Sequence, residues 1–174
     1  MFNLIATTYR GLERQARREM FNLLKMIGDP EPRAEITSVM GLITAQTTLD
    51  PYEAVAGIMR KYSEDPLSIQ YLIRVIPVDV VVNTDVDEMA GAVESLVPKI
   101  GVGESFRITV EKRRTSIHSV DIIKAVAQKV ERRVSLENPD WVILIEVIGG
   151  VTGISVLRPS QIFHALRGTA SESP

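Results

Sequence analysis

Basic side chains gather where a strand is expected to run into a helix. Between residues 107 and 133 there are eight lysines and arginines against three acids, although the whole chain carries a net charge of −2. The eight are Arg107, Lys112, Arg113, Arg114, Lys124, Lys129, Arg132 and Arg133. Such a local concentration of positive charge can hold the phosphate backbone of a nucleic acid, with an affinity that falls as salt is added.

Polar residues at the same junction could extend this surface. Thr115, Ser116 and His118 stand just before the expected helix, whose first backbone N–H groups also favour an anion. A solvated, charge-rich helix face is the alternative interpretation, because clustered lysines and arginines are a weak signal by themselves. The sequence predicts an RNA-binding surface made of Arg107, Lys112, Arg113, Arg114, Thr115, Ser116, His118, Lys124, Arg132 and Arg133.

Little else in the sequence indicates chemistry. The chain has no cysteine, which excludes disulfides and thiolate catalysis, and its two histidines, His118 and His164, are far apart. The acidic residues at positions 85, 87 and 88 are better explained as a helix start than as a metal site. No hydrolase, zinc-peptidase or nucleotide-loop motif is present. We therefore expect a binding module with no catalytic residue, no metal and no cofactor.

The bulk composition is that of an ordinary globular protein. Among the 174 residues, 45% are hydrophobic and 24% are charged, and no apolar run approaches the roughly 18 residues that span a membrane. The first residues lack a positive leader followed by a long apolar stretch, so we expect a cytoplasmic protein without a membrane partner. Aromatic residues make up only 5%, which favours recognition of a structured RNA by shape and phosphate contacts over base stacking.

The first half of the chain has the pattern of a ferredoxin-like unit. Apolar spacing predicts the order strand, helix, strand, strand, helix, strand, which is the βαββαβ arrangement. Asp50 followed by Pro51 marks the start of the second helix, and Pro77 in the last strand indicates a bulge or an edge. We place this domain at residues 1–82. The expected elements are strand 2–8, helix 10–27, strands 34–39 and 42–48, a helix from residue 51, and strand 71–82.

The second half is expected to fold as an αβαββ unit over residues 83–168, packed on the first, with a flexible tail at 169–174. Asp85 is the expected cap of its first helix, and the almost wholly apolar run 141–147 is typical of a central strand covered on both faces. Gly149 and Gly150 favour a tight hairpin. The remaining expected elements are strand 104–112, helix 119–134 and strand 154–157. The fold class is thus α+β, with α/β character in the second unit.

This second unit resembles a THUMP domain. The likeness lies in the strand and basic segment Phe106-Arg107-Ile108-Thr109-Val110-Glu111-Lys112-Arg113-Arg114-Thr115-Ser116, in the helix that follows, and in Asn138-Pro139-Asp140 before a buried strand. A preceding ferredoxin-like unit is the usual companion of that domain. The resemblance implies tRNA binding, with Lys112, Arg113 and Arg114 as the matching residues and Arg107, Thr115 and Ser116 beside them.

The resemblance also implies a role in tRNA modification. In 4-thiouridine synthetases a THUMP domain precedes a pyrophosphatase-type domain, and in other members it precedes a methyltransferase domain. Because this chain ends soon after its last expected strand, it looks more similar to the free-standing adaptors of RNA cytidine acetyltransferase.

We therefore expect a non-catalytic protein that presents tRNA to such an acetyltransferase or to another tRNA-modifying enzyme. Two alternatives stay open. One is an RNA-binding subunit of a split thiolation or methylation enzyme. The other is a protein-interaction domain without an RNA role, which would be favoured if the cations scatter or pair with Glu111, Asp121 and Glu131. The sequence predicts no oligomeric state.

Overall fold

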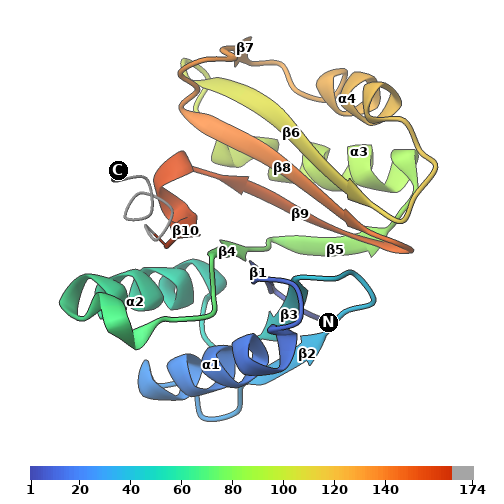
Figure 1. Cartoon of the computed structure of the whole chain (residues 1–174). Coiled ribbons are helices and arrows are strands. Elements are labelled where there is room, and N and C mark those ends of the chain that lie inside the picture. Colours follow the sequence, from blue (N-terminus) through green and yellow to red (C-terminus); the bar gives the residue numbers. More distant parts are fainter. Residues whose placement is uncertain (166–174) are drawn as a thin grey trace, which may run out of the picture. The chain divides into compact units, whose positions relative to one another are not determined.

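The computed structural model describes residues 1–165, so the expected tail at 169–174 lies outside the described residues. The chain divides into two compact units, each with its own five-stranded sheet and two α-helices (Figure 1). The first comprises residues 1–77 together with the segment from Ser160, and the second comprises residues 78–159. The predicted mixed α and β fold class is confirmed.

The first unit has the predicted βαββαβ order, with one short strand added from the end of the chain. Its sheet runs β10-β4-β1-β3-β2, and each neighbouring pair is antiparallel. The elements are β1 (Leu4–Thr7), α1 (Glu13–Met26), β2 (Arg33–Ile36), β3 (Leu42–Gln46), α2 (Pro51–Glu64), the short 3₁₀ turn η1 (Pro66–Ser68), β4 (Arg74–Pro77) and β10 (Phe163–His164).

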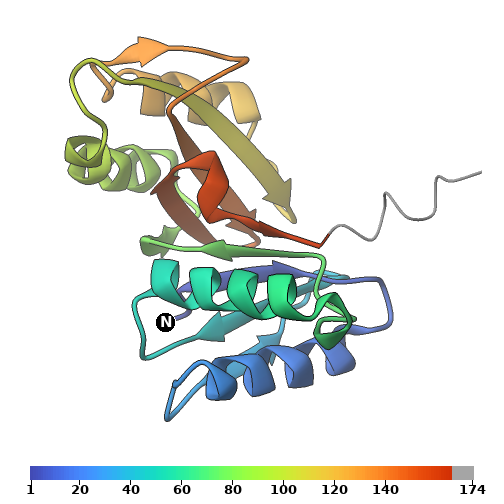
Figure 2. The same ribbon diagram turned by 90° about the vertical axis from the view of Figure 1, so that its left-hand side faces the viewer.

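Helices α1 and α2 cover the same face of this sheet (Figure 2). Apolar side chains of α1 recur at helical spacing, and Ala16, Met20 and Leu23 are buried against Leu4 and Ile43 of the sheet. The predicted start of α2 is confirmed, because the Asp50 carboxylate accepts hydrogen bonds from the first backbone N–H groups of the helix.

A buried carboxylate ties the end of α1 to the end of β3. Asp29 is 1% exposed and accepts hydrogen bonds from the hydroxyls of Thr47 and Thr48, both at 2.6 Å, and from the backbone N–H groups of Glu31 and Thr48. Burial alone would raise the pKa of the Asp29 carboxyl. The donated hydrogen bonds outweigh this effect and leave the pKa below its ordinary value.

The lowered pKa of Asp29 predicts a loss of stability in acid. A carboxyl whose pKa is lower in the folded state stabilises fully above the unfolded value of about 3.9, and the contribution disappears as the pH falls through the folded pKa. We expect Asp29→Asn to be about 1–3 kcal/mol less stable than the parent at pH 7, with the gap closing near pH 3. Urea unfolding at both pH values measures this, with exposed Glu31→Gln as the control. A gap that stays constant across this range would contradict the assignment.

The predicted strand 71–82 is wrong in one respect, because it is two strands in different sheets. β4 ends at Pro77, and β5 (Val80–Asn83) pairs with β9 (Val151–Leu157) of the second unit. Asp79 fixes the break: its backbone N–H donates to the Ile154 carbonyl, and its carboxylate accepts from Lys99 and from the Val156 N–H at 2.7 Å. The units therefore divide at residue 77 rather than 82, and the segment from Ser160 returns to the first unit.

The second unit has a mixed sheet in the order β5-β9-β8-β6-β7. β6 runs parallel to β7 and β8, while β8 and β9 form the predicted hairpin, in which Ile148 pairs with Val151 across Gly149 and Gly150. Its further elements are α3 (Val86–Leu96), the 3₁₀ turn η2 (Val97–Lys99), β6 (Ser105–Arg113), α4 (Ser119–Ala127), β7 (Arg133–Val134), β8 (Trp141–Ile148) and β9 (Val151–Leu157), and the 3₁₀ turn η3 (Pro159–Gln161) follows.

Both helices of the second unit pack on one face of its sheet. Met89 and Val93 of α3 and Ile122 and Val126 of α4 join the odd-numbered side chains of β8 in one core. β8 is buried at all eight positions, as predicted for a central strand. The side chain of Asp85 accepts from the Glu88 N–H at 2.9 Å, so this acidic residue is a helix cap, as expected. No helix within residues 1–165 is long and apolar enough to cross a membrane.

The predicted helix 119–134 is shorter than expected. α4 ends at Ala127, and Arg133 and Val134 instead pair with Ser105 and Phe106 at the edge of the sheet. The Ser135 N–H continues this pairing by donating to the Phe106 carbonyl at 3.0 Å. Edge pairing thus overrides helical spacing, which is a weak constraint where tertiary contacts compete with it.

Candidate nucleic-acid interface

The predicted site begins where β6 gives way to α4, on residues 114–118. Arg114 has a φ of 55°, and it is the one non-glycine residue within 1–165 with a positive φ. The Gly149 N–H donates to the Arg113 carbonyl at 2.9 Å, which fixes the end of β6 beside the hairpin turn. Arg114 therefore turns the chain out of the sheet in a conformation that normally favours glycine, at a cost of about 1–2 kcal/mol.

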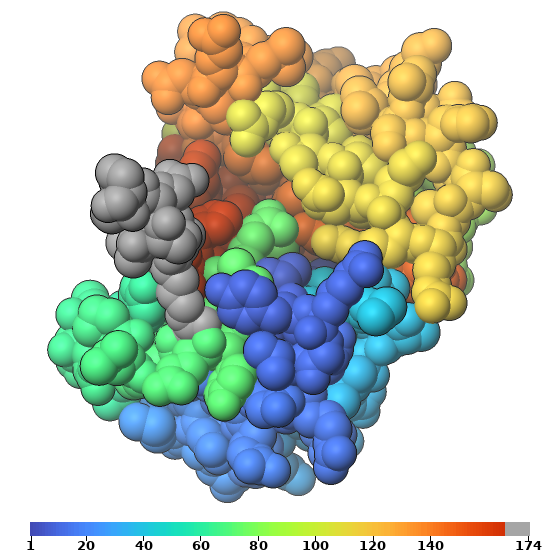
Figure 3. Space-filling view, in the orientation of Figure 1, coloured from blue at the N-terminus to red at the C-terminus, as the bar shows by residue number. Residues whose placement is uncertain are grey.

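Exposed donors surround this turn. Lys112, Arg114, Ser116 and His118 are all exposed, and in Figure 3 the yellow part of the chain that contains them lies on the molecular surface. His118 occupies the N-cap of α4 but makes no capping hydrogen bond from its side chain, so the helix start is left open to an outside acceptor. We call Lys112, Arg114, Ser116 and His118, together with the first turn of α4, the junction surface.

Two local contacts shape the junction surface. The Lys112 ammonium donates to the Ile117 carbonyl at 3.1 Å, and Thr115 Oγ1 accepts from the Ile117 N–H at 3.2 Å. The predicted site residue Thr115 is half-buried, and its hydroxyl oxygen accepts one hydrogen bond within the loop. Lys112 keeps two of its three ammonium protons for another acceptor.

Arg113 does not point toward the junction surface. Side chains alternate along a strand, so Arg113 lies on the sheet face opposite to Lys112. There its guanidinium Nη1 forms an ion pair with the Glu146 carboxylate, which is 1% exposed. Sequence reasoning placed Arg113 in the phosphate-binding set, whereas the structure engages it in a mostly buried ion pair within the sheet.

Three further cations lie near the other end of β6. Arg107 donates to the Leu136 carbonyl at 3.0 Å, Arg132 donates to the Ile100 carbonyl at 3.0 Å, and Arg133 pairs in register with Ser105. Arg107 and Lys112 are five positions apart along the strand, which corresponds to roughly 17 Å. The eight cations consequently form no single patch, and the junction surface holds only two of them.

The remaining two cations lie on α4 and just beyond it. Lys124 is exposed in the last turn of α4, while Lys129 forms an ion pair with Glu94 of α3 at 3.2 Å. Within residues 1–165 the ion pairs made by the eight cations involve Glu146 and Glu94, and none involves the carboxylates of Glu111, Asp121 or Glu131. Pairing with those three acids is therefore not observed. The scatter of the eight cations is observed, and it is the arrangement that favours a protein-interaction domain without an RNA role.

The Asn-Pro-Asp segment has a structural role. Asp140 accepts from the backbone N–H and the hydroxyl of Ser105, at 2.8 and 3.1 Å, and its own N–H donates back to that hydroxyl. This reciprocal set aligns the starts of β6 and β8 as parallel neighbours. The segment fixes the strand whose far end carries the junction surface.

A second anchor beside it could not be foreseen from the sequence. Trp141 donates its indole N–H to Glu104 at 3.0 Å, and the Arg158 guanidinium stacks 4.2 Å from the Trp141 ring while it pairs with Glu104 at 2.8 Å. The hydrogen bond from Trp141, together with those from the Gly101 N–H and Arg158, lowers the pKa of the Glu104 carboxyl. These partners are too far apart in the chain for spacing to link them.

Comparison with known proteins identifies the second unit. The family model of the THUMP domain matches residues 83–157. Residues 83–157 form a THUMP domain. The match contains the whole junction surface, from Lys112 to the first turn of α4. No curated protein sequence significantly matches the chain.

Solved structures share the fold of both units. PH1313 from Pyrococcus horikoshii Ot3 gives a TM-score of 0.70 at 17% identity, over 95% of this chain and 56% of that one. TrmN from Thermus thermophilus gives 0.61 at 18% identity, over 91% and 47%. A 4-thiouridine synthetase, solved with RNA and ATP, gives 0.53 at 16% identity, over 91% and 42%. The chain spans about half the length of these proteins.

The strained turn at Arg114 predicts opposite effects on folding and binding. Arg114→Gly relieves the positive φ and should stabilise the THUMP domain by about 0.5–1 kcal/mol after the higher entropy of an unfolded glycine is counted. The same change removes one cation and, if the chain binds tRNA as the sequence predicts, should lower tRNA affinity about fivefold at low salt. Arg114→Ala is the matched control, because it removes the charge and keeps the positive φ. Urea unfolding measures the stability and filter binding measures the affinity. If Arg114→Gly proved less stable than the parent, the positive φ at Arg114 would not be a source of strain.

Proposed function

We propose that this chain binds tRNA through the junction surface of its THUMP domain and holds it for a separate modifying enzyme. The main support is that Lys112, Arg114 and the uncapped start of α4 lie together at one exposed turn within residues 83–157. Phosphate oxygens match this set, because ammonium, guanidinium and backbone N–H groups are all donors without acceptor capacity. The chain itself supplies binding and no catalysis, and its expected place is the cytoplasm.

The similar structures support an RNA partner. The 4-thiouridine synthetase was solved in complex with RNA and shares the fold over 91% of this chain. The shared part makes up 42% of the 4-thiouridine synthetase chain, so more than half of that protein lies outside the fold that it shares with this chain. The same division of labour between two polypeptides would leave binding to this chain and chemistry to its partner.

For the partner we propose an RNA cytidine acetyltransferase, on the likeness of the chain to free-standing adaptors of that enzyme. The fold shared with a 4-thiouridine synthetase favours a second candidate, in which the chain is the RNA-binding subunit of a split thiolation enzyme, or of a methylation enzyme built in the same way. Both candidates use the same junction surface, and they differ only in the nucleoside that is produced.

Nucleoside analysis separates these possibilities. The purified chain is incubated with unmodified tRNA and acetyl-CoA, S-adenosylmethionine or ATP with a sulfur donor, first alone and then with an RNA cytidine acetyltransferase. We expect no new nucleoside with this chain alone, and acetylcytidine to form faster when the chain accompanies the acetyltransferase. A modified nucleoside made by the chain alone would overturn the non-catalytic role, and an unaltered acetylation rate would exclude the acetyltransferase as the partner.

A further inference from the structure

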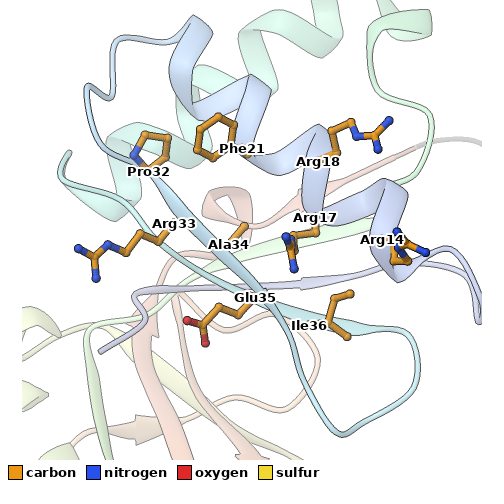
Figure 4. Close-up of a pocket in the computed structure, with 9 residues that line it drawn as sticks. All are labelled: Arg14, Arg17, Arg18, Phe21, Pro32, Arg33, Ala34, Glu35 and Ile36. Atoms are coloured by element: carbon orange, nitrogen blue, oxygen red, sulfur yellow. The ribbon is translucent and has the colours of Figure 1, made fainter.

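The first unit carries an arginine-lined pocket that the proposed function does not use. Arg14, Arg17, Arg18 and Phe21 recur at positions i, i+3, i+4 and i+7 of α1, and therefore lie along one side of the helix. Between this side and β2 there is an open pocket of about 700 Å³ (Figure 4). Its wall on the β2 side comprises Pro32, Arg33, Ala34, Glu35 and Ile36.

Positive charge dominates this pocket. Arg14, Arg17 and Arg18 line it from α1, and within residues 1–165 none of the three forms an ion pair. The side chains of Arg33 and Glu35 on β2 point away from α1 (Figure 4). The acids of α1 are engaged elsewhere. Glu13 accepts from the Gly41 N–H at 2.8 Å, and Glu19 accepts from three successive backbone N–H groups at residues 70–72. The pocket therefore attracts an anionic partner.

The floor of the pocket is a sheet edge. Within the described residues β2 pairs with β3 only, and it ends the sheet. The Thr37 N–H donates to the Leu42 carbonyl, and Glu35 pairs with Thr44 in the same register. Because hydrogen-bonded and open positions alternate in an antiparallel pair, the N–H and C=O groups of Ala34 and Ile36 point outward from the edge. The unpaired N–H and C=O groups of such an edge strand can form hydrogen bonds with the main chain of another strand.

We propose that this pocket binds an extended acidic segment of a partner protein, which adds to β2 as a further strand. Carboxylates of the segment would pair with Arg14, Arg17 and Arg18, and its main chain would use the outward groups of Ala34 and Ile36. Phe21 and Ile36, each 40% exposed, supply apolar contacts for side chains between the acids. An RNA backbone fits less well, because its phosphates would face the outward carbonyl groups of Ala34 and Ile36, and both partners would then be acceptors.

A peptide of alternating Glu and Val residues, capped at both ends, is the probe. We expect it to bind the full chain, and the double change Arg17→Glu with Arg18→Glu to weaken binding about tenfold or more, while Arg60→Glu on α2 leaves it unaltered. Amide exchange of the parent protein gives a second measurement that needs no variant. The amides of Ala34 and Ile36 should exchange about tenfold more slowly when roughly nine-tenths of the chain carries the peptide.

Three outcomes would overturn the inference. In the first, the double change leaves the peptide affinity unaltered. In the second, the peptide binds but does not slow exchange of the Ala34 and Ile36 amides, and in the third, an RNA oligonucleotide displaces the peptide without slowing exchange of either amide. Different variants test peptide binding and tRNA binding, so one proposal can be contradicted while the other stands. The double change at Arg17 and Arg18 should leave tRNA affinity intact, and Lys112→Glu with Arg114→Glu should leave peptide affinity intact.

Discussion

Replacing Arg113 with alanine is expected to destabilise the THUMP domain by about 3–5 kcal/mol. The guanidinium is paired with Glu146, whose carboxylate is 1% exposed in the middle of the sheet. Taking away Arg113 removes the ion pair that offsets the desolvation of the Glu146 carboxylate, and the penalty for losing a buried pair is much larger than for an exposed one. Urea unfolding at neutral pH measures the loss.

The control for this prediction lies on the same face of the same strand. Arg107→Ala removes a guanidinium that donates to the Leu136 carbonyl and should cost about 1 kcal/mol. The double change Arg113→Met with Glu146→Met should recover most of the loss, because it removes both charges and keeps the volume. If Arg113→Ala cost no more than Arg107→Ala, the ion pair between Arg113 and Glu146 would not stabilise the fold.

Reversing both charges of the junction surface is expected to lower tRNA affinity about a hundredfold at low salt. Lys112→Glu with Arg114→Glu removes the two proposed phosphate contacts and adds two repulsive charges near the start of α4. The dependence of affinity on salt should flatten by about two units in the slope of the logarithmic plot, because about two fewer counterions are released. Filter binding between roughly 50 and 200 mM salt gives both quantities.

Two variants bound the interpretation of that result. Arg60→Glu reverses one exposed charge on α2, away from the junction surface, and should leave the tRNA affinity nearly unchanged. Arg133→Glu tests the cations near the other end of β6 and should have a smaller effect than the junction pair. Reversal of Arg113 is unsuitable for this purpose, because it would unfold the domain that it is meant to probe. Equal losses for Arg60 and the junction pair would indicate a non-specific charge effect.

Periodicity was sufficient to predict most elements of both units. The stripe of Ala16, Met20 and Leu23, the cap at Asp50 and the uniformly apolar run of β8 are local signals, and each one specifies its element without tertiary information. The division of the predicted strand 71–82 was not predictable, because the hydrogen bonds of Asp79 come from Lys99 and Val156. The early end of α4 likewise depends on pairing with Ser105 and Phe106.

The sequence predicted the position of the basic β6–α4 turn, but only in part which side chains lie on it. Charge density located the β6–α4 turn correctly as an exposed basic junction. It could not separate Arg114 from Arg113, because that difference depends on a partner 33 residues further along the chain. The sequence does not indicate the arginines of α1 as a site, because Glu13 and Glu19 flank them. Only the structure shows that those two carboxylates accept from backbone N–H groups elsewhere.

Amide chemical-shift mapping of the full chain with tRNA tests the central claim most directly. The account predicts that the largest shifts on titration fall on residues 112–120, at the end of β6 and the start of α4, and that they fade as salt is added. Strong tRNA binding with those amides unmoved, or no shift anywhere at low salt, would contradict a tRNA site at the junction surface.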